Sequence, residues 1–316
     1  MLRIVAACSI VVLLGIGGFS GVALNRAPTE DDIQVVELAP RYHLIADRTA
    51  NLVLLTGDDA SMVTGVLRPS LVAAAKATMA RLQAPPIRWV LALEDTLDEQ
   101  YDSTIANGDG GWGRQGAITL AHERFRSRIA RFGKTGAIAN GMPALGFSHV
   151  VQVYLAGEEV HLIHDRRGYS DADLVVHFEK EGILYLGASF TTDGYPAIDV
   201  RRRGSITGLI ETADAFLRFR KNRAVVEPIV PGRGRPATMD DLQAYRDMLA
   251  AVRDRVQAGI AAGRTRDEIV ASKPTRDLDE RWGRGPIAPD RFVRMVCDSI
   301  TEEKPAATAP ARHDHS

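Results

Sequence analysis

The sequence predicts an α/β protein in which a mixed β-sheet sandwich carries helices on its outer faces. Two predicted strand hairpins lie near the middle of the chain, and strand–helix units stand on both sides of them. The end of the chain is helical. Layering sheets and helices buries the apolar face of each of these elements, so their order along the chain favours a sandwich.

The two hairpins are marked by apolar segments that flank a glycine turn. The first spans residues 150–163 around Gly157, and the second spans residues 174–186 around Gly182. Outside the hairpins, strands are expected at residues 52–55, 87–93, 117–120 and 225–230, and helices at residues 69–82, 122–132 and 205–220.

The C-terminal region carries two helix-start signals. Thr238 with Asp241 is predicted to form a capping box, and apolar residues then repeat at three- and four-residue spacing for several turns. Thr265 with Glu268 is a second capping box. A last helix is expected over residues 289–300.

Composition narrows the class of protein. The chain has 316 residues, of which 45% are hydrophobic and 25% charged, so it can bury the core of one large domain. The formal net charge is −1, so the protein as a whole has no strong positive electrostatic field that would attract nucleic acid. We expect no nucleic-acid partner.

The N-terminal segment is typical of an export signal. Residues 1–26 combine Arg3 with an uncharged apolar run that ends in small residues, which favours a cleaved signal peptide over an uncut signal anchor. We expect an exported, periplasmic or secreted protein whose only membrane contact is this segment. Cys297 is then the one cysteine of the mature chain, which excludes an intrachain disulfide. Residues 304–316 are expected to be disordered.

Several stretches match a known family in order. The chain resembles the metallo-β-lactamase superfamily, and within it the exported metallohydrolases with a helical C-terminal extension. The resemblance implies a four-layer αββα fold over residues 41–235, with a helical extension over residues 236–303 packed on it. The stretches that carry it are Asn51 to Asp59, Ile87-Arg88-Trp89-Val90, Gly116 to Glu123, Tyr154 to Val160, Asp171 to Val176, Leu186-Gly187-Ala188-Ser189-Phe190, Tyr195 to Asp199, Gly204-Ser205 and Ile229 to Gly234.

The metal loop of that family departs from its pattern in this chain. The family reads His-x-His-x-Asp-His after the strand that ends near Leu93, because zinc is bound by imidazoles and carboxylates. No histidine occurs between His43 and His122. Two alignments remain open, and they place either Glu94, Thr96, Asp98 and Glu99 or Asp98, Gln100, Asp102 and Ser103 at the ligand positions.

The remaining ligand positions depart as well. The resemblance implies that Tyr169 and Arg233 stand where the family has ligand histidines, and Ala188 where it has the bridging aspartate. An alanine donates nothing to a metal, and an arginine brings a permanent positive charge. We therefore expect no zinc cofactor and no metal at these positions.

Other histidines offer no obvious substitute. His161 and His164 are expected to point to opposite faces of one strand, which disfavours joint ligation. His149 and His177 are expected to be ordinary structural or surface residues, and His122 to open a helix.

Two hypotheses concern what replaced zinc. The acidic loop of Glu94, Asp95, Asp98, Glu99 and Asp102 suits calcium or magnesium, although a solvated loop is the simpler interpretation. Alternatively, the Arg233 guanidinium lies among these carboxylates. The former zinc site is then either an ion-pair network or a pocket for a small polar or anionic ligand. The residues that form this pocket are Asp98, Asp102, Arg167, Tyr169 and Arg233.

The sequence thus predicts a protein of metallo-β-lactamase fold that has lost zinc-dependent hydrolysis and has a binding or scaffolding role. Its expected partner is a small polar ligand or a periplasmic protein. The alternative is an active hydrolase of the same fold that uses an oxygen-rich metal site or a metal-free mechanism.

Overall fold

The structure is a computed structural model that describes residues 33–93, 112–131, 142–155, 157–164, 166–222 and 228–302. The predictions for the leader, the metal loop and the C-terminal tail lie outside these residues. Within the described ranges, no helix combines the length and the apolar character that crossing a membrane requires. The helices are α1 (Pro69–Leu82), α3 (Glu123–Arg131), α5 (Ile206–Asn222), α6 (Met239–Ala261), α7 (Arg266–Ala271), α8 (Asp279–Trp282) and α9 (Pro289–Glu302), with the 3-10 turns η2 (Gly113–Gln115) and η3 (Val200–Arg202).

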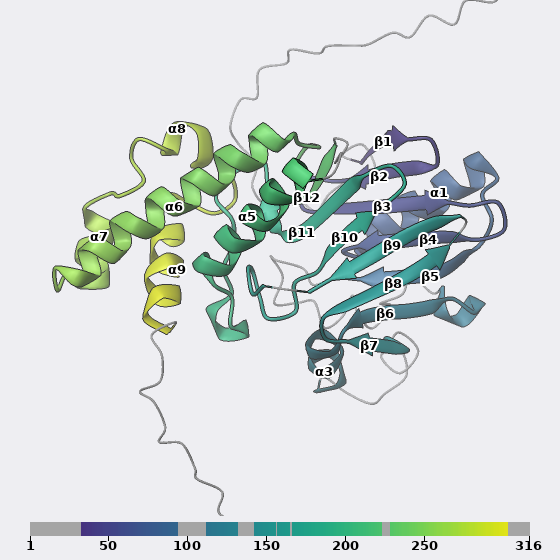
Figure 1. Ribbon diagram of the computed structural model, residues 1–316, viewed down its shortest axis with the longest axis horizontal. Coiled ribbons are helices and arrows are strands. Elements are labelled where there is room, and N and C mark those ends of the chain that lie inside the picture. Colours follow the sequence, from purple (N-terminus) through teal and green to yellow (C-terminus); the bar gives the residue numbers. More distant parts are fainter. Residues whose placement is uncertain are drawn as a thin grey trace, which may run out of the picture.

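The described strands form two sheets (Figure 1). The first has seven strands in the order β1 to β7, antiparallel from β1 to β4 and parallel from β4 to β7. The second has five strands in the order β12-β11-β10-β9-β8, antiparallel except for the β11–β12 pair. The strands are β1 (Gln34–Ala39), β2 (Tyr42–Ala46), β3 (Asn51–Thr56), β4 (Ser61–Gly65), β5 (Ile87–Ala92), β6 (Ile118–His122), β7 (Leu145–Phe147), β8 (Val150–Leu155), β9 (Glu158–Ile163), β10 (Val175–Phe178), β11 (Ile183–Thr191) and β12 (Ile229–Arg233).

Side chains alternate between the two faces of each sheet, and this alternation builds the layers. On β3, Val53 and Leu55 enter the core between the two sheets, whereas Leu52 and Leu54 enter the core on the outer face. Because both faces of the sheet are covered, the sequence of this strand is a nearly continuous run of apolar residues.

Helices cover both outer faces, so the fold has four layers in the order αββα, as predicted. Apolar residues of α1 and α3 pack on the seven-stranded sheet. Those of α5, α6 and α9 form one core with the five-stranded sheet. Tyr245 of α6 reaches that sheet directly, because its hydroxyl donates to the carbonyl oxygen of Ser189 at 3.0 Å.

Most of the predicted elements are present. Helix α1 has the predicted bounds, both hairpins form with a positive φ at Gly157 and Gly182, and both capping boxes are present. Cys297 is a buried free thiol, as expected. The C-terminal end of one strand was predicted wrongly, since β12 runs on through the Pro231-Gly232 pair to Arg233. The predicted start of this strand at residue 225 lies outside the described residues. Strands β1, β2, β4 and β7 and the short helix α8 were not predicted from the sequence.

Asn51 ties the two sheets together at the end of β12. Its amide nitrogen, Nδ2, donates to the carbonyl oxygens of Pro231 and Gly234, each at 2.9 Å. The hydroxyl of Tyr185, on β11, donates to the backbone oxygen of Asn51 at 2.7 Å. The side chain of Asn51 is fully buried, and it fixes the turn that carries Arg233.

Candidate functional site

The described ligand positions of the resemblance lie within β11, at the end of β12 and in the loop before β10. The metal-loop positions, Glu94, Thr96, Asp98, Glu99 and Asp102, lie outside the described residues. Ala188 lies on β11, and Arg233 ends the neighbouring strand β12. A Cβ atom at Gly232 would lie 2.4 Å from the carbonyl oxygen of Gly187, so only glycine permits this close approach of the strands.

Arg233 is buried and already has a carboxylate partner. Its Nε donates to both carboxylate oxygens of Asp193, at 2.8 and 2.7 Å, and the residue is 6% exposed. The hydroxyl of Thr191 donates to the same carboxylate. A guanidinium has no lone pair for a metal, so this position supplies a cation and no ligand. The proposed partners in the acidic loop are not among the described residues, and the partner in the structure is Asp193.

The loop that contains Tyr169 is organised around the buried carboxylate of Asp173. Asp173 accepts hydrogen bonds from the backbone nitrogens of Tyr169 and Ser170, at 2.6 and 2.9 Å, and from the hydroxyl of Ser189 at 2.8 Å. The phenol oxygen of Tyr169 lies 3.5 Å from a guanidinium nitrogen of Arg202. Tyr169 is thus part of a hydrogen-bonded structural loop.

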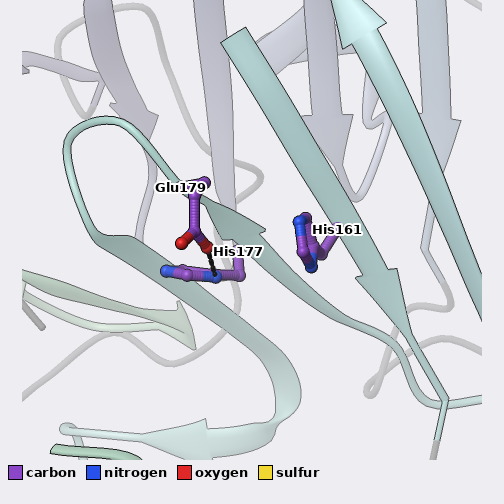
Figure 2. Close-up of side chains that lie close together, drawn as sticks. All are labelled: His161, His177 and Glu179. Atoms are coloured by element: carbon purple, nitrogen blue, oxygen red, sulfur yellow. Dashed lines mark ion pairs between the residues drawn. The ribbon is translucent and has the colours of Figure 1, made fainter. Parts of the chain in front are cut away.

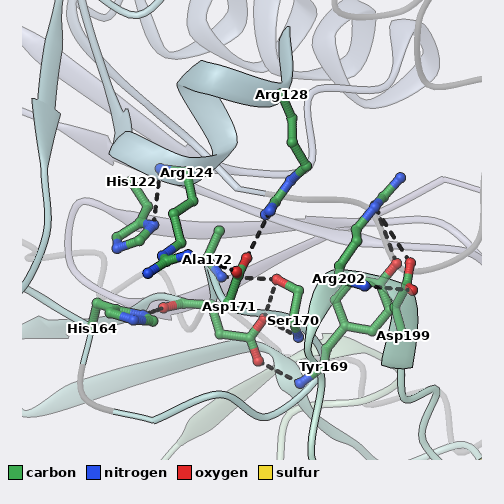
Figure 3. Close-up of polar contacts among 11 residues, drawn as sticks. His122, Arg124, Arg128, His164, Tyr169, Ser170, Asp171, Ala172, Asp199 and Arg202 are labelled. Carbon is green, nitrogen blue, oxygen red and sulfur yellow. Dashed lines mark hydrogen bonds and ion pairs between the residues drawn. The ribbon is translucent and has the colours of Figure 1, made fainter. Parts of the chain in front are cut away.

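Asp171 links this loop to helix α3. Its two oxygens pair with Arg124 at 3.1 Å and with Arg128 at 2.7 Å (Figure 3). The carboxylate is buried, whereas the Arg124 side chain is half exposed. Two cations hold one carboxylate here, which anchors the loop before β10 to α3.

The rings of His122 and His164 lie in contact beside this loop, tilted by 42° to one another. Their ring centroids lie 4.1 Å apart, and Nδ1 of His164 lies 2.7 Å from the backbone oxygen of Asp173. Burial, followed by the neighbouring His164, lowers the pKa of His122 from 6.5 to about 4. The ring of His122 is therefore neutral at pH 7.

Acidification is expected to destabilise the protein through His122. In the unfolded chain this imidazole takes up a proton as the pH falls below 6.5, whereas in the folded chain it stays neutral down to about pH 4. The unfolded state therefore binds more protons in this window, and stability falls as the pH drops through it. Between pH 7 and pH 5 the contribution lost is about 2 kcal/mol.

Urea unfolding of the wild type and of His122→Gln at pH 7 and pH 5 measures this loss. Glutamine does not titrate, so the variant should lose about 2 kcal/mol less than the wild type over this interval. Equal losses in the two proteins would show that His122 titrates normally.

A cavity of about 380 Å³ lies between the five-stranded sheet and α5, a size in the range of small-molecule sites. Ile163, Val175 and Phe216 give it an apolar wall, and Arg166 and Asp173 are among its polar lining residues. The pocket predicted from the sequence is a different one. Arg167, Tyr169 and Arg233, the described members of that prediction, do not line this cavity, and Arg167 is exposed.

His161, His177 and Glu179 come together in this cavity, and sequence reasoning missed the group (Figure 2). Nδ1 of His177 lies 3.1 Å from a carboxylate oxygen of Glu179. His161 faces His177 across the β9–β10 pair, with ring centroids 5.8 Å apart. No spacing motif in the sequence marks the group, because the register of β9 against β10 brings His161 opposite His177.

Solved structures with the same fold identify the architecture. The metallo-β-lactamase from Pontibacter korlensis matches with a TM-score of 0.55 and 12% identity, over 69% of this chain and 99% of that protein. The stereoselective inverting sec-alkylsulfatase Pisa1 from a Pseudomonas species matches with a TM-score of 0.62 and 15% identity, over 88% of this chain and 52% of the sulfatase. The DIM-1 metallo-β-lactamase matches with a TM-score of 0.55 and 10% identity, over 69% of this chain and 97% of that protein.

The likeness lies in the structure and not in the sequence. No protein-family model matches the chain, and no curated protein sequence matches it significantly. This chain has the metallo-β-lactamase fold. It spans about half the length of the sulfatase.

Proposed function

We propose that this protein has lost zinc-dependent hydrolysis at the ligand positions of its fold and acts by binding a small polar ligand. The observation that carries the proposal is the buried Arg233–Asp193 pair at the position of the last ligand histidine. Ala188, at the position of the bridging aspartate, adds no donor atom. The export signal in residues 1–26 supports a role outside the cytoplasm.

Both the charge and the chemistry of Arg233 disfavour zinc binding at its position. An arginine side chain keeps its proton at any pH a protein tolerates, so Arg233 cannot become a ligand. Its pair with Asp193 is neutral overall, so it supplies no net negative charge that would attract a divalent cation to this position. Without a bound metal, nothing there lowers the pKa of a water molecule to make the hydroxide nucleophile.

The ligand is expected in the cavity beneath α5. The cavity volume of about 380 Å³ suits a small molecule. The apolar wall, Ile163, Val175 and Phe216, provides burial for such a molecule, while Arg166, which pairs with Glu211 at 3.0 Å, and Asp173 add polar groups to the lining. Such a lining fits a molecule with an apolar body and polar substituents.

Hydrolysis assays test the loss of activity. The purified protein, supplied with zinc, is incubated with a β-lactam, a secondary alkyl sulfate, a lactone and a thioester. The β-lactam and the alkyl sulfate cover the activities named for the structural neighbours, and the lactone and the thioester extend the test to other acyl bonds. We expect no turnover above the buffer rate.

A His177→Gln variant assayed in parallel serves as the control for zinc bound elsewhere in the protein. Turnover that persists in this variant and is abolished by a chelator would contradict the proposal, because it would come from a metal at the fold's own ligand positions.

A further inference from the structure

We propose that His161, His177 and Glu179 bind a divalent transition-metal ion, with zinc as the best match, at a site separate from the ligand positions of the fold. One potential ligand atom from each residue lies within 4.8 Å of the other two. The three side chains lie close together (Figure 2), and all three residues line the cavity beneath α5. The proposal does not depend on the loss of hydrolysis proposed above, since Arg233 and Asp193 lie outside this group.

The residue types match a known coordination chemistry. Two imidazoles and one carboxylate form a ligand set that zinc uses when it keeps a fourth position open. Ligand atoms of a tetrahedral zinc lie about 3.4 Å apart, as follows from bond lengths near 2.1 Å. His177 Nδ1 and the Glu179 oxygen, at 3.1 Å, are already close to this spacing. The remaining ligand must approach by about an ångström, which side-chain rotation can provide.

Paired strands fix the backbone of the site. His161 on β9 stands directly opposite His177 on β10 in the antiparallel register. Their sequence neighbours Val160, Leu162 and Val176 are buried in the core between the sheets, so both histidines must face the outer side. Directly opposed residues have Cβ atoms about 5 Å apart, which suits two imidazoles that share one ion.

A further carboxylate orients one of the ligands. Glu159 accepts a hydrogen bond from Nε2 of His161 at 2.8 Å, and the amide of Gln152 donates to the same oxygen at 3.1 Å. Metal-binding histidines commonly donate their second ring N–H to a carboxylate, which holds the ring and sets its tautomer. In this arrangement Nδ1 is the nitrogen of His161 that binds the ion, and Glu159 is a positioning residue.

The location of the site places the ion where it can bind a small molecule in the cavity. The His177 side chain is 6% exposed and that of Glu179 is 33% exposed, so the ion lies at the boundary between protein and cavity. A ligand set of three leaves a fourth position for an oxygen or nitrogen donor. A small molecule in the cavity, beside Phe216 and Ile163, is the donor that we expect there.

Zinc titration of the full chain tests the site. The protein is stripped with a chelator, dialysed and titrated with zinc at pH 7, and the stoichiometry and dissociation constant are measured by calorimetry. The wild type should bind one zinc ion with high affinity. The His161→Gln and His177→Gln variants should bind at least about 100-fold more weakly, because each removes a ligand. Glu159→Gln should weaken binding by about 10- to 100-fold.

His149→Gln is the matched control, since it removes an exposed histidine that lies outside the group. It should bind zinc like the wild type. The tail histidines, His313 and His315, are present in every variant and contribute the same background. Equal zinc affinity in His161→Gln, His177→Gln and His149→Gln would overturn the proposal, as would the absence of saturable binding in the wild type.

Cobalt provides a readout that does not depend on how the variants fold. Co²⁺ takes the same tetrahedral ligands as zinc and absorbs visible light when it does so. One equivalent of Co²⁺ added to the wild type should give intense tetrahedral absorption that stoichiometric zinc removes. A spectrum identical to that of hydrated Co²⁺ would overturn the proposal.

Discussion

Replacing Asp193 with asparagine is expected to lower the free energy of unfolding by about 3 kcal/mol. The variant leaves the guanidinium of Arg233 buried beside a neutral amide, in place of the carboxylate that accepts from its Nε at 2.7 and 2.8 Å. Breaking a buried ion pair by removing one partner costs more than the pair contributes, because the remaining charge has lost its solvation and its partner. Partial exposure of Asp193 keeps the expected loss at the lower end of such costs.

Urea unfolding of Asp193→Asn and Asp247→Asn measures this loss. Asp247 also pairs with an arginine, at 3.3 Å, but its side chain is 57% exposed. The control should therefore cost less than about 1 kcal/mol. If Asp193→Asn is as stable as Asp247→Asn, Arg233 is solvated and the structural reason for excluding zinc from its position fails.

Asn51→Ala is expected to destabilise the protein by a similar amount, about 3 kcal/mol. The change removes the donor to the buried carbonyl oxygen of Pro231 and to the partly buried carbonyl oxygen of Gly234, and leaves both without that hydrogen bond. Each unsatisfied buried polar group costs about 1–3 kcal/mol. The turn that carries Arg233 loses its anchor to β3 at the same time.

The control for this variant is Gln243→Ala, which removes an exposed amide that donates to Asp247 on the same helix. Its expected effect is within about 0.5 kcal/mol of zero. Tyr185→Phe, which removes only the hydroxyl donor to the Asn51 backbone, should lie between the two. An Asn51→Ala variant no less stable than the control would show that the two sheets are not joined there.

Much of the fold could be predicted because its signals are local. Pro69 marks the start of α1, Gly157 and Gly182 mark hairpin turns, and Thr238 with Asp241 marks the start of α6. Strands such as β4 could not be predicted, because Ser61-Met62-Val63-Thr64-Gly65 is short and mixed in polarity. Its burial comes from the sheets and helices around it.

The candidate site was less accessible from the sequence, because its residues meet through tertiary contacts. Arg233 was singled out, but its partner Asp193 lies 40 residues away and belongs to no motif. The sequence places His161 and His164 close together, but β9 ends at Ile163, and the histidine opposite His161 is His177 on the neighbouring strand. Strand register decides which side chains meet, and neither spacing nor composition reveals it.

The two proposals together describe a metallo-β-lactamase fold that binds metal at a different position from the ligand positions of the fold. The ligand positions of the fold hold a buried Arg233–Asp193 pair, whereas His161, His177 and Glu179 gather on the outer face of the five-stranded sheet. We propose that the first arrangement excludes a cation and that the second suits one. Any activity that this protein has is therefore expected beneath α5 and not at the edge of the sandwich.

Anomalous diffraction at the zinc absorption edge, from crystals of the protein grown with zinc, tests the central claim most directly. The account predicts no anomalous peak beside Ala188 and Arg233 and a single strong peak within bonding distance of His161, His177 and Glu179. A zinc ion bound at the ligand positions beside Ala188 and Arg233 would contradict the claim that zinc chemistry has been lost there.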